Sequence, residues 1–167
     1  MTAHDTADIP PSNMRPPAIG GLLWLLAVAV VFAPFNAALS LLGVWKKVYA
    51  SGLAERLTNP ASGEFHPYWS ELLSVELGYH LVLVPLLLIQ LWLFTRRSRL
   101  FPIFYVGIHT LTALFLMGNI WAVKQILPDA MMLDDATLKS LLALAVAFGV
   151  WTPYLYLSDR AHNTFIR

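Results

Sequence analysis

Four stretches of this 167-residue chain contain no charged side chain, and each is long enough to cross a lipid bilayer. They cover residues 16–45, 77–95, 100–123 and 140–158. A membrane-spanning helix needs about 20 consecutive, mostly apolar residues, because the hydrocarbon core of a bilayer is roughly 30 Å thick. The sequence therefore predicts an all-α integral membrane protein with four transmembrane helices.

Residues 1–17 are polar and rich in proline, so they cannot build a packed core, and we predict a disordered tail there. Residues 18–167 are then expected to form one transmembrane domain. Four consecutive spans of this kind favour an antiparallel four-helix bundle. The predicted spans, charged ends included, are at about residues 18–45, 72–95, 100–123 and 138–158.

Composition excludes several kinds of function. Charged residues make up 13% of the chain, about half of the ~25% that is typical of soluble domains. The chain contains no cysteine, which rules out disulfides, thiolate catalysis and cysteine-bound metals. The formal net charge of +1 gives no basic surface for nucleic acid. The lipid bilayer is therefore the first expected partner.

Basic residues near the span ends predict the orientation of the helices. The tail, the link between the second and third spans and the C-terminal end together carry six Lys and Arg, against five in the two longer loops. Three of the six, Arg96, Arg97 and Arg99, fall in one short turn. This density leads us to expect that turn and both termini in the cytoplasm.

Two end motifs carry a family resemblance. The C-terminal end reads Trp151-Thr152-Pro153-Tyr154, then Ser158 and Arg160, then Thr164-Phe165, and the first span opens with Ile19-Gly20-Gly21-Leu22-Leu23. An acidic residue, Glu76, enters the second span, and a short basic turn precedes Phe101-Pro102. Over residues 18–167 the chain resembles a family of small four-span bacterial membrane proteins catalogued as domain of unknown function 2569. It departs from that family at Ala161-His162, where a basic residue usually follows the arginine.

This resemblance implies a multi-pass protein of the bacterial inner (cytoplasmic) membrane with both ends in the cytoplasm. It implies no activity, substrate or cofactor, because none is assigned to the family.

Polar side chains within the spans are candidate functional residues, because polar groups are costly in a membrane and usually face the bundle interior. Glu76 and His80 lie four residues apart, on one helix face. We predict a polar pocket that opens to the outer side, with these two residues as its ionisable centre. The alternative is that the polar groups bond to one another and only set the register of the helices. The predicted pocket residues are Asn36, Glu76, His80, His109 and Asn119.

Histidines in a four-helix membrane bundle also invite a haem interpretation. At ~1.5 Å per residue, His109 is expected to lie roughly 9 Å closer to the cytoplasmic side than His80. Two axial ligands to one iron need similar depths in the membrane. Glu76 and His80 alone are too few ligands for a metal. We therefore predict no cofactor and no metal.

The arginines at the cytoplasmic side are candidate contacts for the headgroups of bound anionic lipids. The alternative is that they act as plain topology anchors. The candidate headgroup contacts are Arg96, Arg97, Arg99 and Arg160.

No nucleophile–base pair, metal set or cofactor fingerprint is visible, so the sequence favours a non-catalytic accessory or binding subunit with a membrane or envelope protein partner. The second hypothesis is a small transporter or lipid-handling protein that uses the polar pocket. A haem or quinone redox protein is the least favoured.

Overall fold

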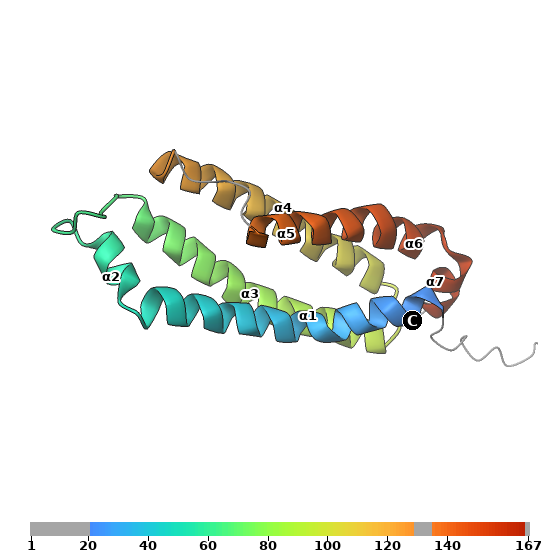
Figure 1. Ribbon diagram of the computed structural model, residues 1–167. Coiled ribbons are helices and arrows are strands. Elements are labelled where there is room, and N and C mark those ends of the chain that lie inside the picture. The colour runs from blue at the N-terminus through green and yellow to red at the C-terminus, as the bar shows by residue number, and fades with distance from the viewer. Residues whose placement is uncertain (1–20, 129–134, 166–167) are drawn as a thin grey trace, which may run out of the picture.

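The computed structural model describes residues 21–128 and 135–165, and this part of the chain is helical without strands (Figure 1). The predicted tail, residues 1–17, lies outside these residues. Four helical segments are long and apolar enough to cross a membrane, Leu22–Tyr49, Trp69–Thr95, Phe101–Ile126 and Asp135–Leu157. The prediction of an all-α chain with four helices of spanning length is confirmed for the part described.

The first two spans are joined by a structured loop. Helix α1 (Leu22–Val44) continues into a π-helical turn, η1 (Trp45–Tyr49), and the short helix α2 (Leu53–Thr58) precedes α3 (Trp69–Thr95). The Tyr49 hydroxyl donates to the backbone carbonyl of Leu73 over 3.0 Å, which ties η1 to α3. In the loop itself, Arg56 and Glu64 form an ion pair at 2.7 Å.

The third and fourth spans are α4 (Phe101–Ile126) and a continuous segment made of α5 (Asp135–Val146), η2 (Ala147–Trp151) and α6 (Thr152–Leu157). Pro153 has no backbone N–H to bond the carbonyl of Gly149, and the helix widens into π geometry just before it. The Thr152 hydroxyl donates to the Ala147 carbonyl over 2.9 Å. The last short helix is α7 (Asp159–Thr164).

The turn between α3 and α4 contains a left-handed residue. Arg97 has a φ of 53°, and the amides of Arg97 and Ser98 bond back to the carbonyls of Phe94 and Leu93, both over 3.0 Å. This is a Schellman motif, which satisfies carbonyls at a helix C-terminus. The chain thereby reverses within a few residues and starts α4 with Pro102 in its first turn.

The two ends of the helix assembly differ, and we name each by its contents. The arginine end holds the α3–α4 turn, α7 and the start of α1, and the loop end holds α2, the start of α3 and the end of α4 (Figure 1). α1 packs along α3, α3 packs along α4, and α4 contacts α5, η2 and α6.

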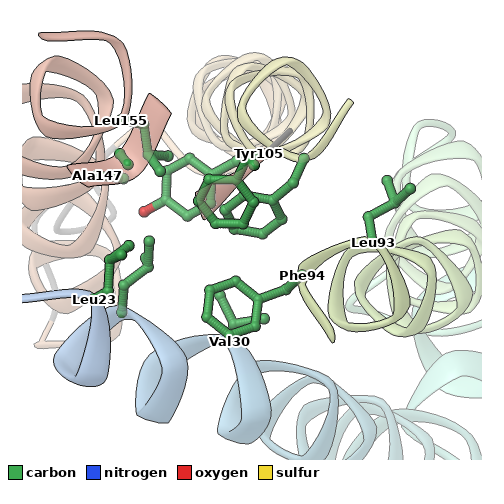
Figure 2. Packing of buried hydrophobic residues seen from close by; sticks show 11 residues of the cluster. Leu23, Val30, Leu93, Phe94, Tyr105, Ala147 and Leu155 are labelled. Carbon is green, nitrogen blue, oxygen red and sulfur yellow. The ribbon is translucent and has the colours of Figure 1, made fainter. Parts of the chain in front are cut away.

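The main core lies at the arginine end. Figure 2 shows its side chains converging from α1, α3, α4 and the C-terminal segment. Phe101 is fully buried, and its ring contacts those of Phe94, Tyr105 and Phe165 at centroid distances of 5.1, 5.9 and 4.8 Å. The buried members of this core are Leu23, Leu26, Val30, Leu93, Phe94, Phe101, Tyr105, Ala147, Leu155, Ala161 and Phe165.

The loop end is more loosely packed. A smaller buried cluster of Ala37, Leu87 and Ile108 occupies the middle of the bundle.

Many large apolar side chains remain exposed along the helices, including Leu114, which is 63% exposed, and Met117, which is 68% exposed. Such an apolar exterior is costly in water and suits the hydrocarbon of a bilayer. The chain is therefore a multi-pass membrane protein.

Candidate functional site

Glu76 and His80, the predicted ionisable centre of the pocket, are both half-buried on α3. The contact between them runs from the imidazole Nδ1 of His80 to the backbone carbonyl oxygen of Glu76, over 2.9 Å. A carbonyl oxygen only accepts, so Nδ1 carries the proton, and in the neutral ring Nε2 is left as an acceptor.

Tyr79, the neighbour of His80, is a residue that sequence reasoning missed. Its ring stacks on Phe115 of α4 with a centroid distance of 3.6 Å and an interplanar angle of 3°. Its hydroxyl donates to the Thr112 hydroxyl over 3.0 Å, and Thr112 donates to the Ile108 carbonyl. Tyr79 therefore fixes α3 against α4 at this level. In sequence a tyrosine among apolar residues gives little signal, because its ring suits a core and its hydroxyl is only one polar atom.

His109 lies in a different layer of the bundle from His80. Its Nδ1 is 2.8 Å from the Tyr105 carbonyl, and its ring meets Phe148 of η2 edge-on at 6.4 Å. The His80 ring instead meets Phe115 edge-on, also at 6.4 Å. Phe115 and His109 are six residues apart on one helix, which is ~9 Å of rise. The two histidines thus occupy different levels and face different neighbours. Within residues 21–128 and 135–165, no group of three or more His, Asp or Glu is placed to hold a metal ion.

The two asparagines of the predicted pocket are separated. Asn36 is exposed on α1, whereas Asn119 lines a groove between α3 and α4. The structure therefore places the His80 ring beside Phe115, on which Tyr79 stacks, and Phe115 and Asn119 line the same groove. Asn36 is not part of that lining, and the His109 ring meets Phe148 instead.

The groove between α3 and α4 at the loop end has a volume of about 670 Å³. That volume lies within the range of ~300–1,000 Å³ that is usual for ligand sites. Its walls are mostly apolar, with Glu71 and Gln125 among its polar groups. The residues that line it are Tyr68, Glu71, Leu72, Val75, Leu114, Phe115, Gly118, Asn119, Trp121, Ala122, Gln125 and Ile126.

Two small residues, Gly118 and Ala122, lie one turn apart on the α4 wall of the groove. A Cβ atom added to Gly118 would meet nothing within 4 Å. Small residues spaced by four let helix backbones approach closely in membranes, and polar side chains such as Asn119 bond across the contact. The α4 wall thus has the features of a helix–helix interface.

The predicted arginine cluster does lie at one end of the bundle, but its members are held in different ways. The Arg96 guanidinium is 5.5 Å from the centre of the Trp92 ring, a cation–π distance. Nη1 of Arg160 lies 2.8 Å from the position that a Cβ on Gly21 would take. Arg99 lines a small pocket between α4 and α7.

Gln90 is another residue that sequence reasoning passed over. It is 2% exposed on α3, and its Oε1 has no hydrogen-bond partner among the described residues. The sequence did offer a signal for this residue, because Gln90 is a single amide in a run of leucines and tryptophan. A buried acceptor without a partner is destabilising, because it loses the hydrogen bond that water supplies in the unfolded state.

Replacing Gln90 by leucine is therefore expected to raise the free energy of unfolding by about 1–2 kcal/mol. Denaturation of the detergent-solubilised protein, followed by circular dichroism, measures the change. Gln125→Leu, on the groove wall, is the matched control and is expected to shift stability by less than about 0.5 kcal/mol. A less stable Gln90→Leu protein would show that Oε1 has a donor, such as a bound water, in the native state.

The family comparison agrees with the end motifs and with the four apolar helices. Comparison with the curated proteins and with the solved structures gave no match. The profile of a family described as "Protein of unknown function (DUF2569)" matches residues 16–166. That match covers the four long helices and both end motifs, and the chain therefore belongs to this family.

Proposed function

We propose that the protein is a non-catalytic accessory subunit of the bacterial inner membrane, and that its α3–α4 groove receives a transmembrane helix of a partner protein. In this proposal the four helices form an antiparallel bundle with both termini and the α3–α4 turn in the cytoplasm. The groove then opens in the outer half of the membrane.

The observation that carries the proposal is the open wall of α4 around Gly118 and Ala122. A helix with small residues of its own reaches the α4 backbone and gains close van der Waals contact, which drives helix association in lipid together with hydrogen bonds and lipid entropy.

Polar groups in the groove supply specificity. Asn119 lies beside Gly118, and Glu71 and Gln125 belong to the same lining. A partner that brings a hydroxyl, amide or basic group to these side chains gains about 0.6 kcal/mol for each hydrogen bond within the membrane.

Filling the groove tests this function. Gly118→Leu is expected to reduce the amount of partner that co-purifies in mild detergent by at least about tenfold, since a side chain now occupies the space of the incoming helix. The same protein partner must also form a photo-crosslink to a reactive side chain placed at Ala122. Gly43→Leu is the matched control, because Gly43 lies on α1 and also has open space around its Cβ position. Equal recovery of the partner from both variants would refute the assignment of the groove.

The second candidate is a small transporter or lipid-handling protein. Its support is the combination of mostly apolar walls with Glu71 and Gln125 in one groove, which suits an amphipathic molecule. The same crosslinking experiment separates the two, because a lipid adduct at Ala122 without a protein adduct supports lipid handling.

A further inference from the structure

A second pocket, at the arginine end, has a different chemical character from the groove. It lies between the start of α4 and the α6–α7 segment, with a volume of about 330 Å³. Arg99 and His162 contribute cationic and hydrogen-bonding groups, and Ile103, Leu155 and Phe165 contribute apolar walls. Both polar residues are exposed at the rim. The pocket therefore combines a basic mouth with an apolar interior.

The wall of this pocket is fixed by the core. The backbone leaves the helix at Ser158 and re-enters it in α7, and Ala161 is fully buried there. Thr164 donates its hydroxyl to the Arg160 carbonyl over 2.7 Å, and Phe165 stacks on Phe101 at 4.8 Å. His162 is thus carried on a turn that is anchored on both sides, so its place opposite Arg99 is part of the fold.

The electrostatics of this end favour an anion. Arg96, Arg97, Arg99 and Arg160 all belong to it, together with the carboxylate of Asp159. Arg99 also precedes the first residue of the 26-residue helix α4 by two positions, and a helix N-terminus carries partial positive charge. A guanidinium can donate two parallel N–H bonds to a phosphate, and an imidazole N–H can add a further donor.

An apolar groove begins where the pocket ends. This second groove runs between α3 and α4 with a volume of about 510 Å³, and its lining includes Leu86, Ile89 and Phe104. Ile103, which is 64% exposed, lines both the pocket and this groove. A molecule with an anionic head and a hydrocarbon tail can therefore occupy both at once, crossing over Ile103.

We propose that the Arg99–His162 pocket binds the phosphate headgroup of an anionic phospholipid from the leaflet at the arginine end. One acyl chain lies along the apolar groove beyond Ile103. This site shares no lining residue with the groove around Gly118 and Asn119, which the proposed function uses, and it is independent of that groove. In this chain the phosphate would meet the His162 imidazole as well as the Arg99 guanidinium.

Native mass spectrometry of the full chain, released from detergent with added phosphatidylglycerol or phosphatidylcholine, tests the site. The unmodified protein is expected to retain phosphatidylglycerol preferentially. Arg99→Gln is expected to lower that preference about fivefold, since one Lys or Arg near a lipid surface contributes ~1 kcal/mol. His162→Gln, which removes the imidazole, is expected to lower it by less. Arg56→Gln, at the loop end, is the matched control and is expected to leave the preference unchanged.

Three results would overturn the proposal. The first is equal retention of the two lipids by the unmodified protein, and the second is an unchanged preference in the Arg99→Gln/His162→Gln double variant. The third is displacement of the bound species by millimolar inorganic phosphate, which would identify a site for a free anion. Ile103→Trp fills the crossing point and is expected to reduce retention of both lipids, while circular dichroism checks that the helices remain.

Discussion

Replacing Phe101 by alanine is expected to lower the free energy of unfolding by about 3–5 kcal/mol, the usual effect of truncating a fully buried phenylalanine. The ring has no exposed surface, and it joins Phe94 of α3 to Phe165 at the C-terminal end. Its removal leaves a cavity where three parts of the chain meet. Chemical denaturation in detergent, followed by tryptophan fluorescence, measures the loss.

Met117→Ala is the matched control for this prediction. Met117 lies on the same helix but is 68% exposed to the surrounding lipid or detergent, so its truncation opens no cavity and is expected to change stability by less than about 0.5 kcal/mol. Equal effects of the two substitutions would show that the aromatic cluster at the arginine end does not stabilise the fold.

Replacing Gly21 by alanine is expected to lower the free energy of unfolding by about 1–3 kcal/mol. Gly21 precedes α1 with φ 62° and ψ −137°, a backbone conformation that residues with a Cβ atom rarely adopt. The nearest obstacle to a new Cβ is Nη1 of Arg160, at 2.8 Å. That atom is the far end of a flexible side chain and moves aside, so the backbone conformation accounts for most of the expected effect.

A double-mutant cycle separates these two contributions. The effect of Gly21→Ala in an Arg160→Ala background is expected to differ from its effect in the unmodified protein by less than about 0.5 kcal/mol. Gly118→Ala is the control for adding a methyl group, because Gly118 lies within a regular helix with open space around it. A neutral Gly21→Ala would show that α1 does not start with the backbone conformation described here.

The pairing of Gly21 with Arg160 was beyond the reach of the sequence. Both residues belong to end motifs that the sequence shows clearly, but 139 positions separate them along the chain. They meet because α1 begins at the end of the bundle where α7 turns back. A contact of this kind depends on how the helices pack, and local residue patterns do not encode it.

The predicted polar pocket around Glu76 and His80 was also only partly accessible from the sequence. The sequence correctly placed Glu76 and His80 on one helix face, because the 3.6-residue period of a helix relates them without any neighbour. Whether Asn36 or Asn119 also faces them depends on the rotation of each helix about its own axis. In a membrane both sides of a helix are apolar, so hydrophobic periodicity gives little information about that rotation. The Gly118–Ala122 wall and the open groove beside it were missed for this reason.

The sequence by itself determined that this is a membrane protein, that it is all-helical with four long apolar helices, and which family it belongs to. These follow from runs of uncharged residues and from short motifs, because backbone polar groups in a bilayer must be satisfied within helices. Only the tertiary structure decided which side chains meet. It placed Arg99 and His162 at one pocket and Asn119 at another, and it left Asn36 outside both, because helix rotation and tilt are set by packing among many small contacts rather than by any local pattern.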